Sequence, residues 1–380
     1  MKKIVIASDS FKGSLSSAEV AKAAAAGVHD IFPDCEVVCL PMGDGGEGTC
    51  EAIAETLTCE WANVQTTDPL GRPIKAKYAI TRAEHPTAII ELAQASGLTL
   101  LSESERDPMK TSTYGTGILI ADAVERGCRK FIIGLGGSAT NDGGTGMLEA
   151  LGFRFVDDSC MHIRGCCGEK LSAIADIDIS HVPQAILNSS FTAACDVDTP
   201  FTGPDGATRT FAPQKGADSA SIEILEHGMT SLARAISRKY GLDLEHIKGT
   251  GAAGGTGGAI LTFLGGSLCK GSDLVLDAAG FDEKTTGADM IITGEGKIDS
   301  QSFCGKLPSA VLKRADLKGI PVVAIGGIID LNEIQIRESG FQSVLPIQPR
   351  PTDQASHTAA MDPDNTFRNI RQTIRDFLKK

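Results

Sequence analysis

The sequence predicts an α/β protein with two domains, one of which is discontinuous along the chain. Its 380 residues are enough for two domains. Near both ends short apolar runs alternate with helical segments, which is typical of a parallel sheet with helices on its faces. The segment between them contains antiparallel strand patterns. We therefore expect a discontinuous domain of residues 1–66 and 288–380, and an inserted mixed-sheet domain of residues 67–287.

The first domain opens with a strand, a helix and a second strand. Residues 3–7 form an apolar run that predicts a strand, and Ser16 predicts the capped start of a helix. Residues 36–40 predict the next strand, and the glycine-rich segment 43–48 opens another helix. The C-terminal part contributes three more short strands, predicted at residues 290–293, 322–325 and 344–347.

The inserted domain differs in texture. Alternating polar and apolar residues at 61–67 and 74–81 flank a turn at 68–71, which predicts an antiparallel pair. The remaining elements of this domain are strands predicted at 87–93, 130–135 and 191–195, and helices predicted at 114–127 and 219–240.

Composition excludes several classes of protein. The net charge of −12 and the pI of about 5.1 disfavour nucleic-acid and anionic-membrane binding. No apolar run reaches the ~20 residues of a membrane span. The N-terminal MKKIVIAS leads directly into a strand pattern, so no secretory signal is expected. The 11 cysteines lack a C-x-x-C spacing, which favours reduced thiols and a cytoplasmic location.

A first candidate loop follows the first strand directly. Asp9, Ser10 and Lys12 bring a carboxylate, a hydroxyl and an ammonium to the carboxyl end of a strand, where open α/β sheets bind ligands. The alternative is an ordinary loop in which Asp9 and Ser10 only cap the next helix.

A second candidate loop is Gly43-Asp44-Gly45-Gly46-Glu47-Gly48. Its glycines expose backbone N–H groups at a helix N-terminus, which favours an anion. Asp44 and Glu47 suit hydroxyl groups or Mg²⁺. The alternative is a flexible turn before a helix with an acidic start.

A third candidate loop spans residues 134–144 between a buried strand and a helix. Gly136, Gly137, Ser138 and Asn141 offer N–H groups and side chains that suit a polyphosphate, and Asp142 suits Mg²⁺. Neither a Walker A motif nor a dinucleotide fingerprint in its usual frame is present.

A fourth candidate segment is Thr293-Gly294-Glu295-Gly296-Lys297. Lys297, flanked by glycine after a strand, can neutralise a transferring phosphoryl group, with Glu295 beside it. The alternative is a solvated lysine near a helix start. Asp196 follows another strand and suits a cation or a base, although a turn cap is equally consistent.

These segments together resemble the type 1 glycerate kinases. The matching strings are SDSFKGSLS, MGDGGEGT, GLGGSATNDGG, CDVD, FAPQKGA, GAAGG and TGEGKIDSQS, in order from residue 8. The resemblance implies two α/β domains, one with a flavodoxin-like or Rossmann-like parallel sheet. It also implies phosphorylation of D-glycerate with ATP and Mg²⁺, mostly giving 2-phosphoglycerate.

Under this resemblance each candidate residue takes a role. The catalytic candidates are Lys297, Asp196 and Asp44. The glycerate-binding candidates are Asp9, Ser10, Lys12, Gly45, Gly46 and Glu47. The nucleotide-binding candidates are Gly136, Gly137, Ser138, Asn141, Asp142 and Glu295, and the metal candidates are Asp142 and Asp196.

Three alternatives stay open at this point. The product can carry the phosphate on the 3-hydroxyl, because residues alone do not decide the position. The chain can be an NAD(P)-dependent hydroxy-acid dehydrogenase, as its glycine-rich loops suggest, or a metabolite sensor without activity. The oligomeric state is open as well, a homodimer included.

Overall fold

The computed structural model describes residues 1–43, 50, 53–54, 57, 59–303, 305–348 and 362–380. The chain forms two compact units, each described by itself. Unit 1 comprises Met1–Gly45, Glu55–Leu57 and Lys270–Lys380, and unit 2 comprises Gly46–Ala54 and Thr58–Cys269. The predicted domain boundaries place residues 46–54, 58–66 and 270–287 differently, and they stay a prediction.

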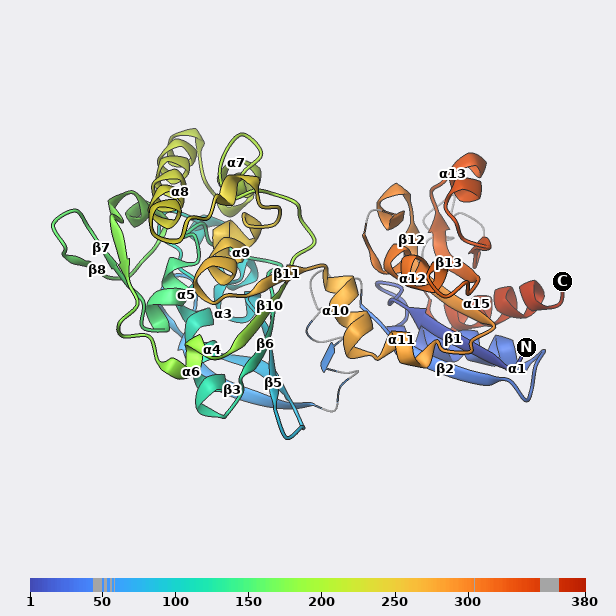
Figure 1. Ribbon diagram of the computed structural model, residues 1–380. Helices are drawn as coiled ribbons and strands as arrows, with labels where there is room; N and C mark the ends of the chain where they lie inside the picture. The colour runs from blue at the N-terminus through green and yellow to red at the C-terminus, as the bar shows by residue number, and fades with distance from the viewer. Residues whose placement is uncertain (44–49, 51–52, 55–56, 58, 304, 349–361) are drawn as a thin grey trace. The chain divides into compact units, whose positions relative to one another are not determined.

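Unit 1 is built on a parallel sheet of five described strands (Figure 1). Their order is β14-β13-β12-β1-β2, and every neighbouring pair is parallel. Numbered along the chain, this is the 2-1-3-4-5 order of flavodoxin-like sheets. The predicted parallel sheet is thus confirmed. The strands are β1 (Lys3–Ser8), β2 (Glu36–Pro41), β12 (Met290–Ile298), β13 (Val322–Ile329) and β14 (Ser343–Pro346).

Helices surround this sheet. Helix α1 starts with the predicted cap, because the Ser16 hydroxyl accepts from the Glu19 N–H and the Glu19 carboxylate accepts from the Ser16 N–H. A Cβ at Gly27 would lie 2.6 Å from the Arg371 carbonyl oxygen, so glycine lets α1 and α15 pack closely. The described helices are α1 (Ser17–His29), α10 (Gly271–Ala278), α11 (Phe281–Lys284), α12 (Leu307–Asp316), α13 (Glu333–Glu338) and α15 (Pro363–Leu378).

Unit 2 contains a mixed sheet, as predicted. The order is β11-β10-β6-β5-β4-β3, with the first four strands parallel and β4 antiparallel to both β3 and β5. The predicted antiparallel pair is therefore β3 and β4. The strands are β3 (Cys59–Thr67), β4 (Pro73–Thr81), β5 (Thr87–Glu91), β6 (Lys130–Gly134), β10 (Ser190–Ala194) and β11 (Ser267–Cys269).

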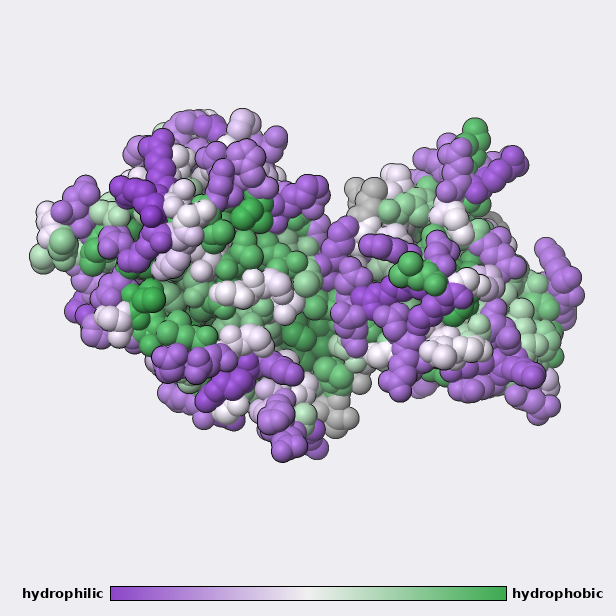
Figure 2. Space-filling view, viewed as in Figure 1, coloured by the Kyte–Doolittle hydropathy of each residue, from purple (hydrophilic) through white to green (hydrophobic). Residues whose placement is uncertain are grey.

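The rest of unit 2 packs around this sheet. The predicted long helix is α8 (Ser219–Tyr240), and α4 (Tyr114–Glu125) packs on α5 (Thr145–Ala150). Figure 2 shows mainly hydrophilic residues over α8 and a more hydrophobic surface over α9 (Ala252–Phe263). The further elements are α3 (Ala93–Ser96), α6 (Gln184–Leu187), α7 (Ala207–Phe211), and a small antiparallel sheet of β7 (Arg154–Val156), β8 (His162–Ile163) and β9 (Asp176–Asp178).

Several predicted strand ends were wrong, and the strand predicted at 322–325 runs on to Ile329 as β13. The predicted strand at 290–293 continues to Ile298, because β13 pairs with it beyond the expected end, as far as Ile298 opposite Ile329. The predicted strand at 87–93 stops at Glu91, and α3 begins at Ala93. Among the described residues no helix combines the length and hydrophobicity of a membrane span.

Candidate active site

The carboxyl edge of the unit 1 sheet gathers two of the predicted segments. Strand β1 lies between β2 and β12. From β1 the chain runs to β2 on one side, and the later strands β12, β13 and β14 follow on the other side, so the strand order switches between β1 and β12. Such a switch point is where open α/β sheets bind ligands. The Asp9 loop leaves β1 here, and Ser8 pairs with Gly294 of β12. The sheet therefore brings the Asp9 loop and the Glu295–Lys297 segment side by side.

The Asp9 loop is held by short-range hydrogen bonds. Asp9 is largely buried, and its Oδ1 accepts from the Ser10 N–H at 2.6 Å. The Asp9 N–H donates to the Gly294 carbonyl at 2.9 Å. Lys12 is exposed to solvent. The loop thus presents a fixed carboxylate together with an exposed ammonium.

Glycine allows this close approach of the two segments. A Cβ at Gly294 would lie 2.5 Å from the Ile325 carbonyl oxygen and 3.2 Å from Ser8 Oγ. At Gly296, by contrast, a Cβ would lie 3.6 Å from the backbone nitrogen of Lys12, an ordinary contact distance. A larger residue at Gly294 would push β12 away from its neighbours. Close packing of the strands therefore requires glycine at this position.

Lys297 is an exposed lysine held between two carboxylates. Its Nζ lies 3.1 Å from Asp299 Oδ2 and 3.1 Å from Asp330 Oδ2, while half of the side chain is exposed. Hydrogen bonds to Asp330 and then Asp299 raise the pKa of Lys297, which keeps the ammonium charged at neutral pH. The arrangement orients a cation at the edge of the sheet without burying it.

Glu295 occupies a more enclosed position on the same strand. Its side chain is buried, and Oε2 lies 3.6 Å from the Nζ of Lys306. Lys306 lies at the start of α12, and the sequence analysis gave it no role. The edge therefore carries a second lysine beside a carboxylate.

Unit 2 has its own carboxyl edge, made by β5, β6 and β10. Gly134 pairs with Glu91 on one side and with Ala194 on the other. The glycine-rich loop and Asp196, which is exposed, therefore leave neighbouring parallel strands at the same edge. Glu91 was not predicted as a site residue, yet its Oε1 accepts from the Cys50 N–H at 2.8 Å.

Only the beginning of the loop 134–144 is open to solvent. Gly136 and Gly137 are exposed, whereas Ser138, Asn141 and Asp142 are buried. The Gly137 carbonyl accepts from the Leu98 N–H at 2.8 Å, which ties this part of the loop to the segment after α3. An anion would therefore meet the backbone of Gly136 and Gly137 before any other part of the loop.

Asp142 acts as a clamp inside the unit. It is fully buried, and its Oδ2 accepts from the Thr113 N–H and hydroxyl, both at 2.7 Å, and from the Gly146 N–H at 3.2 Å. Its Oδ1 accepts from the Gly144 N–H at 3.0 Å. Burial raises the pKa of Asp142, against the opposing effect of these donors. A metal would have to displace them, so the predicted metal role of Asp142 stays a prediction.

The GAAGG segment packs tightly against this loop. A Cβ at Gly254 would lie 2.0 Å from the Thr140 carbonyl oxygen, and the Gly143 N–H donates to the Gly254 carbonyl at 2.9 Å. Ala253 adopts a left-handed conformation with φ of 52°. These contacts favour close packing over a separate phosphate loop for residues 249–258.

Two side chains behind the loop hold it in place. Asn141 Nδ2 donates to Thr208 Oγ1 at 3.1 Å. Lys215 Nζ donates to the Thr140 carbonyl at 2.7 Å and to Ser138 Oγ at 3.2 Å. Sequence reasoning assigned no role to Lys215, and the only signal for it was its place in the FAPQKGA string.

Some predicted residues cannot be placed. Asp44, Gly45, Gly46 and Glu47 lie outside the described residues, so their catalytic and glycerate-binding roles stay predictions. Among the described residues no group of three or more His, Cys, Asp or Glu side chains is arranged to hold a metal ion.

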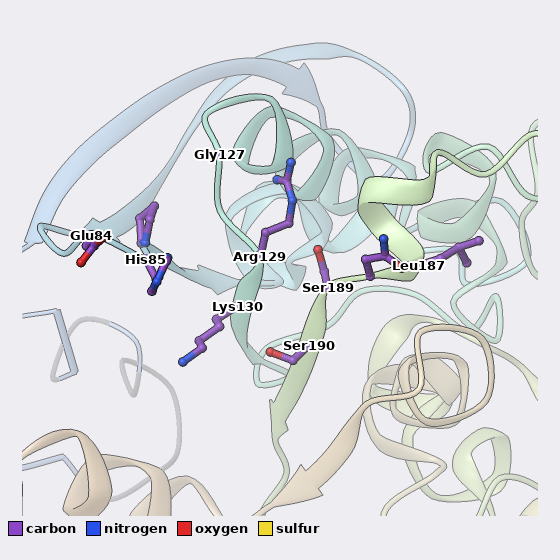
Figure 3. A pocket seen from close by; sticks show the side chains of 10 residues that line it. Glu84, His85, Gly127, Arg129, Lys130, Leu187, Ser189 and Ser190 are labelled. Carbon is purple, nitrogen blue, oxygen red and sulfur yellow. The ribbon is translucent and has the colours of Figure 1, made fainter.

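A pocket of about 400 Å³ lies at the opposite edge of the unit 2 sheet (Figure 3). Residues at the amino ends of β5, β6 and β10 line this pocket. Its two cations point apart in Figure 3, since Arg129 Nη1 donates to the carbonyls of Val124 and Cys128 and Lys130 extends the other way. The pocket therefore lacks the converging cations that a small acid would need.

Comparison with known proteins identifies the relatives of this chain. The sequence profile of the Glycerate kinase family matches residues 4–379. A glycerate kinase of Bacillus subtilis (strain 168) is 41% identical over 375 residues, covering 98% of both chains. A glycerate 2-kinase of Escherichia coli (strain K12) is 40% identical over 374 residues, again covering 98% of both.

A solved structure agrees with these relatives. The crystal structure of a glycerate kinase 2 from Salmonella typhimurium LT2 superposes with a TM-score of 0.84 at 39% identity, covering 100% of this chain and 98% of the other. Both the fold and the sequence match extend over the whole length. The chain therefore belongs to the glycerate kinase family.

Proposed function

We propose that this chain transfers the γ-phosphoryl group of ATP to the 2-hydroxyl of D-glycerate. The observation that carries the proposal is 40% identity, over 98% of both chains, to a protein named glycerate 2-kinase. The family assignment favours a kinase over a dehydrogenase or a sensor. The charged groups at the two carboxyl edges add chemical support.

Phosphoryl transfer demands charge neutralisation and alignment more than covalent catalysis. Lys297 suits the first task because Asp299 and Asp330 hold its ammonium in place. A cation oriented before the reaction stabilises charge on the transferring group without reorganisation. We assign Lys297 this role.

Glycerate needs groups that bind a carboxylate and a second hydroxyl. Lys12 offers an exposed ammonium for the carboxylate, and Asp9 offers a fixed carboxylate for a hydroxyl. A carboxylate that accepts from this hydroxyl would discriminate glycerate from lactate, because lactate leaves it unpaired. Ser10 lies between them in the same loop.

The nucleotide is assigned to the open start of the loop 134–144. Gly136 and Gly137 are exposed residues, and backbone N–H groups of such glycines suit phosphate oxygens. Mg²⁺ typically binds substrate phosphates together with one or two carboxylates. Exposed Asp196 at the same edge fits such a ligand, whereas Asp142 is already saturated by backbone and hydroxyl donors. The ion would neutralise phosphate charge.

The product assay uses enolase as the direct coupling enzyme. Enolase accepts 2-phosphoglycerate and not the 3-isomer. We expect phosphoenolpyruvate to form from the chain, ATP, Mg²⁺, D-glycerate and enolase without added phosphoglycerate mutase. A signal that requires phosphoglycerate mutase would instead indicate transfer to the 3-hydroxyl, and no ADP formed with glycerate would contradict the kinase assignment.

A further inference from the structure

Lys215 is a buried lysine that contacts the inward-turning part of the loop 134–144, directly after its exposed part. It ends the short helix η4 (Pro213–Lys215), and only 2% of its surface is exposed. Its Nζ donates to the Thr140 carbonyl at 2.7 Å and to Ser138 Oγ at 3.2 Å. Both partners follow Gly136 and Gly137 in the chain. The lysine therefore supports the part of the loop that turns inward.

No carboxylate among the described residues lies within salt-bridge distance of Lys215. Lysine is rarely fully buried unless it is paired, because burial without a partner charge is costly. Burial lowers the pKa of Lys215 to about 7, and the charge of Asp142 opposes this shift. Near neutral pH the amine is thus divided between its neutral and charged forms.

Among the residues that the structure describes, Asp142 is the charge that acts on this amine. Asp142 is the charged residue of the loop, and Arg106 packs its backbone against Gly216, next to Lys215. In α7, which packs on η4, Arg209 is exposed and pairs outward with Glu223 at 2.9 Å. The protonation of Lys215 therefore responds mainly to burial, to Asp142 and to any charge that arrives at the loop.

We propose that Lys215 is a positioning residue for the loop 134–144, and that its amine takes up a proton from solvent when a polyphosphate binds to that loop. The inference rests on the proposed role of the loop in nucleotide binding. A nearby anion favours the ammonium over the neutral amine. The ammonium in turn holds Ser138 and Thr140 by hydrogen bonds while the anion binds the backbone N–H groups of Gly136 and Gly137.

The coupling has a defined sign. Below about pH 7 the amine already carries its proton, so anion binding takes up little. Above this value the free protein carries a neutral amine that must be protonated on binding, so affinity falls as pH rises. The limit is about tenfold per pH unit for one coupled proton. A structural lysine unaffected by the ligand would show no such dependence.

Calorimetry of the whole chain with MgATP, without glycerate, measures the proton directly. Titrations at pH 8 in two buffers of different ionisation heat give the number of protons taken up. The terminal phosphate of ATP is then largely ionised and contributes little. We expect the wild type to take up about 0.5–0.9 proton at pH 8 and close to none at pH 6.

Two variants assign the proton. Lys215→Met should bind MgATP about tenfold more weakly at pH 6.5 and take up no proton at pH 8. Lys130→Met, which removes an exposed charge from the amino end of β6, should match the wild type. The KM for glycerate should stay unchanged in Lys215→Met while the KM for ATP rises.

The outcomes distinguish proton coupling at Lys215 from the nucleotide role of the loop 134–144. MgATP binding by the wild type without proton uptake at pH 8 would overturn the inference alone, even if Lys215→Met failed to fold. Undiminished uptake in a folded Lys215→Met variant would do the same. Absence of any MgATP binding would overturn the nucleotide role of the loop, and with it this inference.

Discussion

The two carboxyl edges have the same topological position but opposite electrostatic design. In unit 1 Lys297 is half exposed and paired with Asp299 and Asp330. In unit 2 Asp142 and Lys215 are buried and bonded mainly to backbone and hydroxyl groups. The difference indicates that unit 1 presents a charged side chain to solvent, whereas unit 2 uses buried titratable side chains to hold a loop whose exposed part is backbone.

Removal of Mg²⁺ should have the largest effect on activity. It tests whether the charged groups of the two carboxyl edges suffice for phosphoryl transfer without a divalent ion. We expect excess EDTA to abolish glycerate phosphorylation, because Mg²⁺ neutralises phosphate charge that no described residue of this acidic chain can neutralise alone. Excess Mg²⁺ should restore the rate, as measured by direct separation of ADP from ATP, because enolase itself needs Mg²⁺ and cannot serve as the coupling enzyme here. Full activity in excess EDTA would show that the transfer needs no divalent ion.

Substitution of Lys297 tests the exposed edge. Lys297→Met should lower kcat about 10²–10³-fold with a near-normal KM for glycerate, because the contact is made mainly in the transition state. Steady-state kinetics give both values, and Lys313→Met in α12 serves as a charge-matched control. A kcat within about threefold of the wild type would make Lys297 an ordinary surface residue.

Substitution of Asp142 tests the buried edge. Asp142→Asn should lower the free energy of unfolding by about 2–3 kcal/mol, because an amide NH₂ group would face N–H donors that the carboxylate now satisfies. The single tryptophan, Trp61 in β3, reports urea unfolding of the same unit.

Asp196→Asn is the matched control for that measurement. Asp196 is exposed, so its replacement should change the free energy of unfolding by less than about 0.5 kcal/mol. If Asp142→Asn were equally stable but needed much more Mg²⁺ for activity, Asp142 would be a metal ligand instead of a clamp.

Lys12 should show the smallest effect, confined to substrate binding. Lys12→Met should raise the KM for glycerate about tenfold with little change in kcat, since a bound carboxylate loses its ammonium in ground and transition states alike. Kinetics at varied glycerate and saturating ATP check this split. A change in the KM for ATP alone would move Lys12 from the acid to the nucleotide.

Many elements of the fold were predictable from local patterns. Alternating apolar runs and helices near both chain ends predicted the parallel sheet, and the cap at Ser16 set the start of α1. The glycine-rich segments were placed after strands because glycine and polar residues interrupt the apolar runs. The end of β12 was missed, since pairing with β13 carries the strand through Gly296 and Lys297.

The sequence by itself determined which residues gather at the carboxyl ends of strands, because strand ends and parallel topology follow from near-neighbour patterns. It did not show that Asp142 would be saturated by donors or that Lys215 would lie behind the loop. Both facts depend on segments more than 25 residues apart along the chain, such as Thr113 with Asp142 and Lys215 with Thr140. Only tertiary packing decides which polar side chains lose water, and that loss sets their charge and their role.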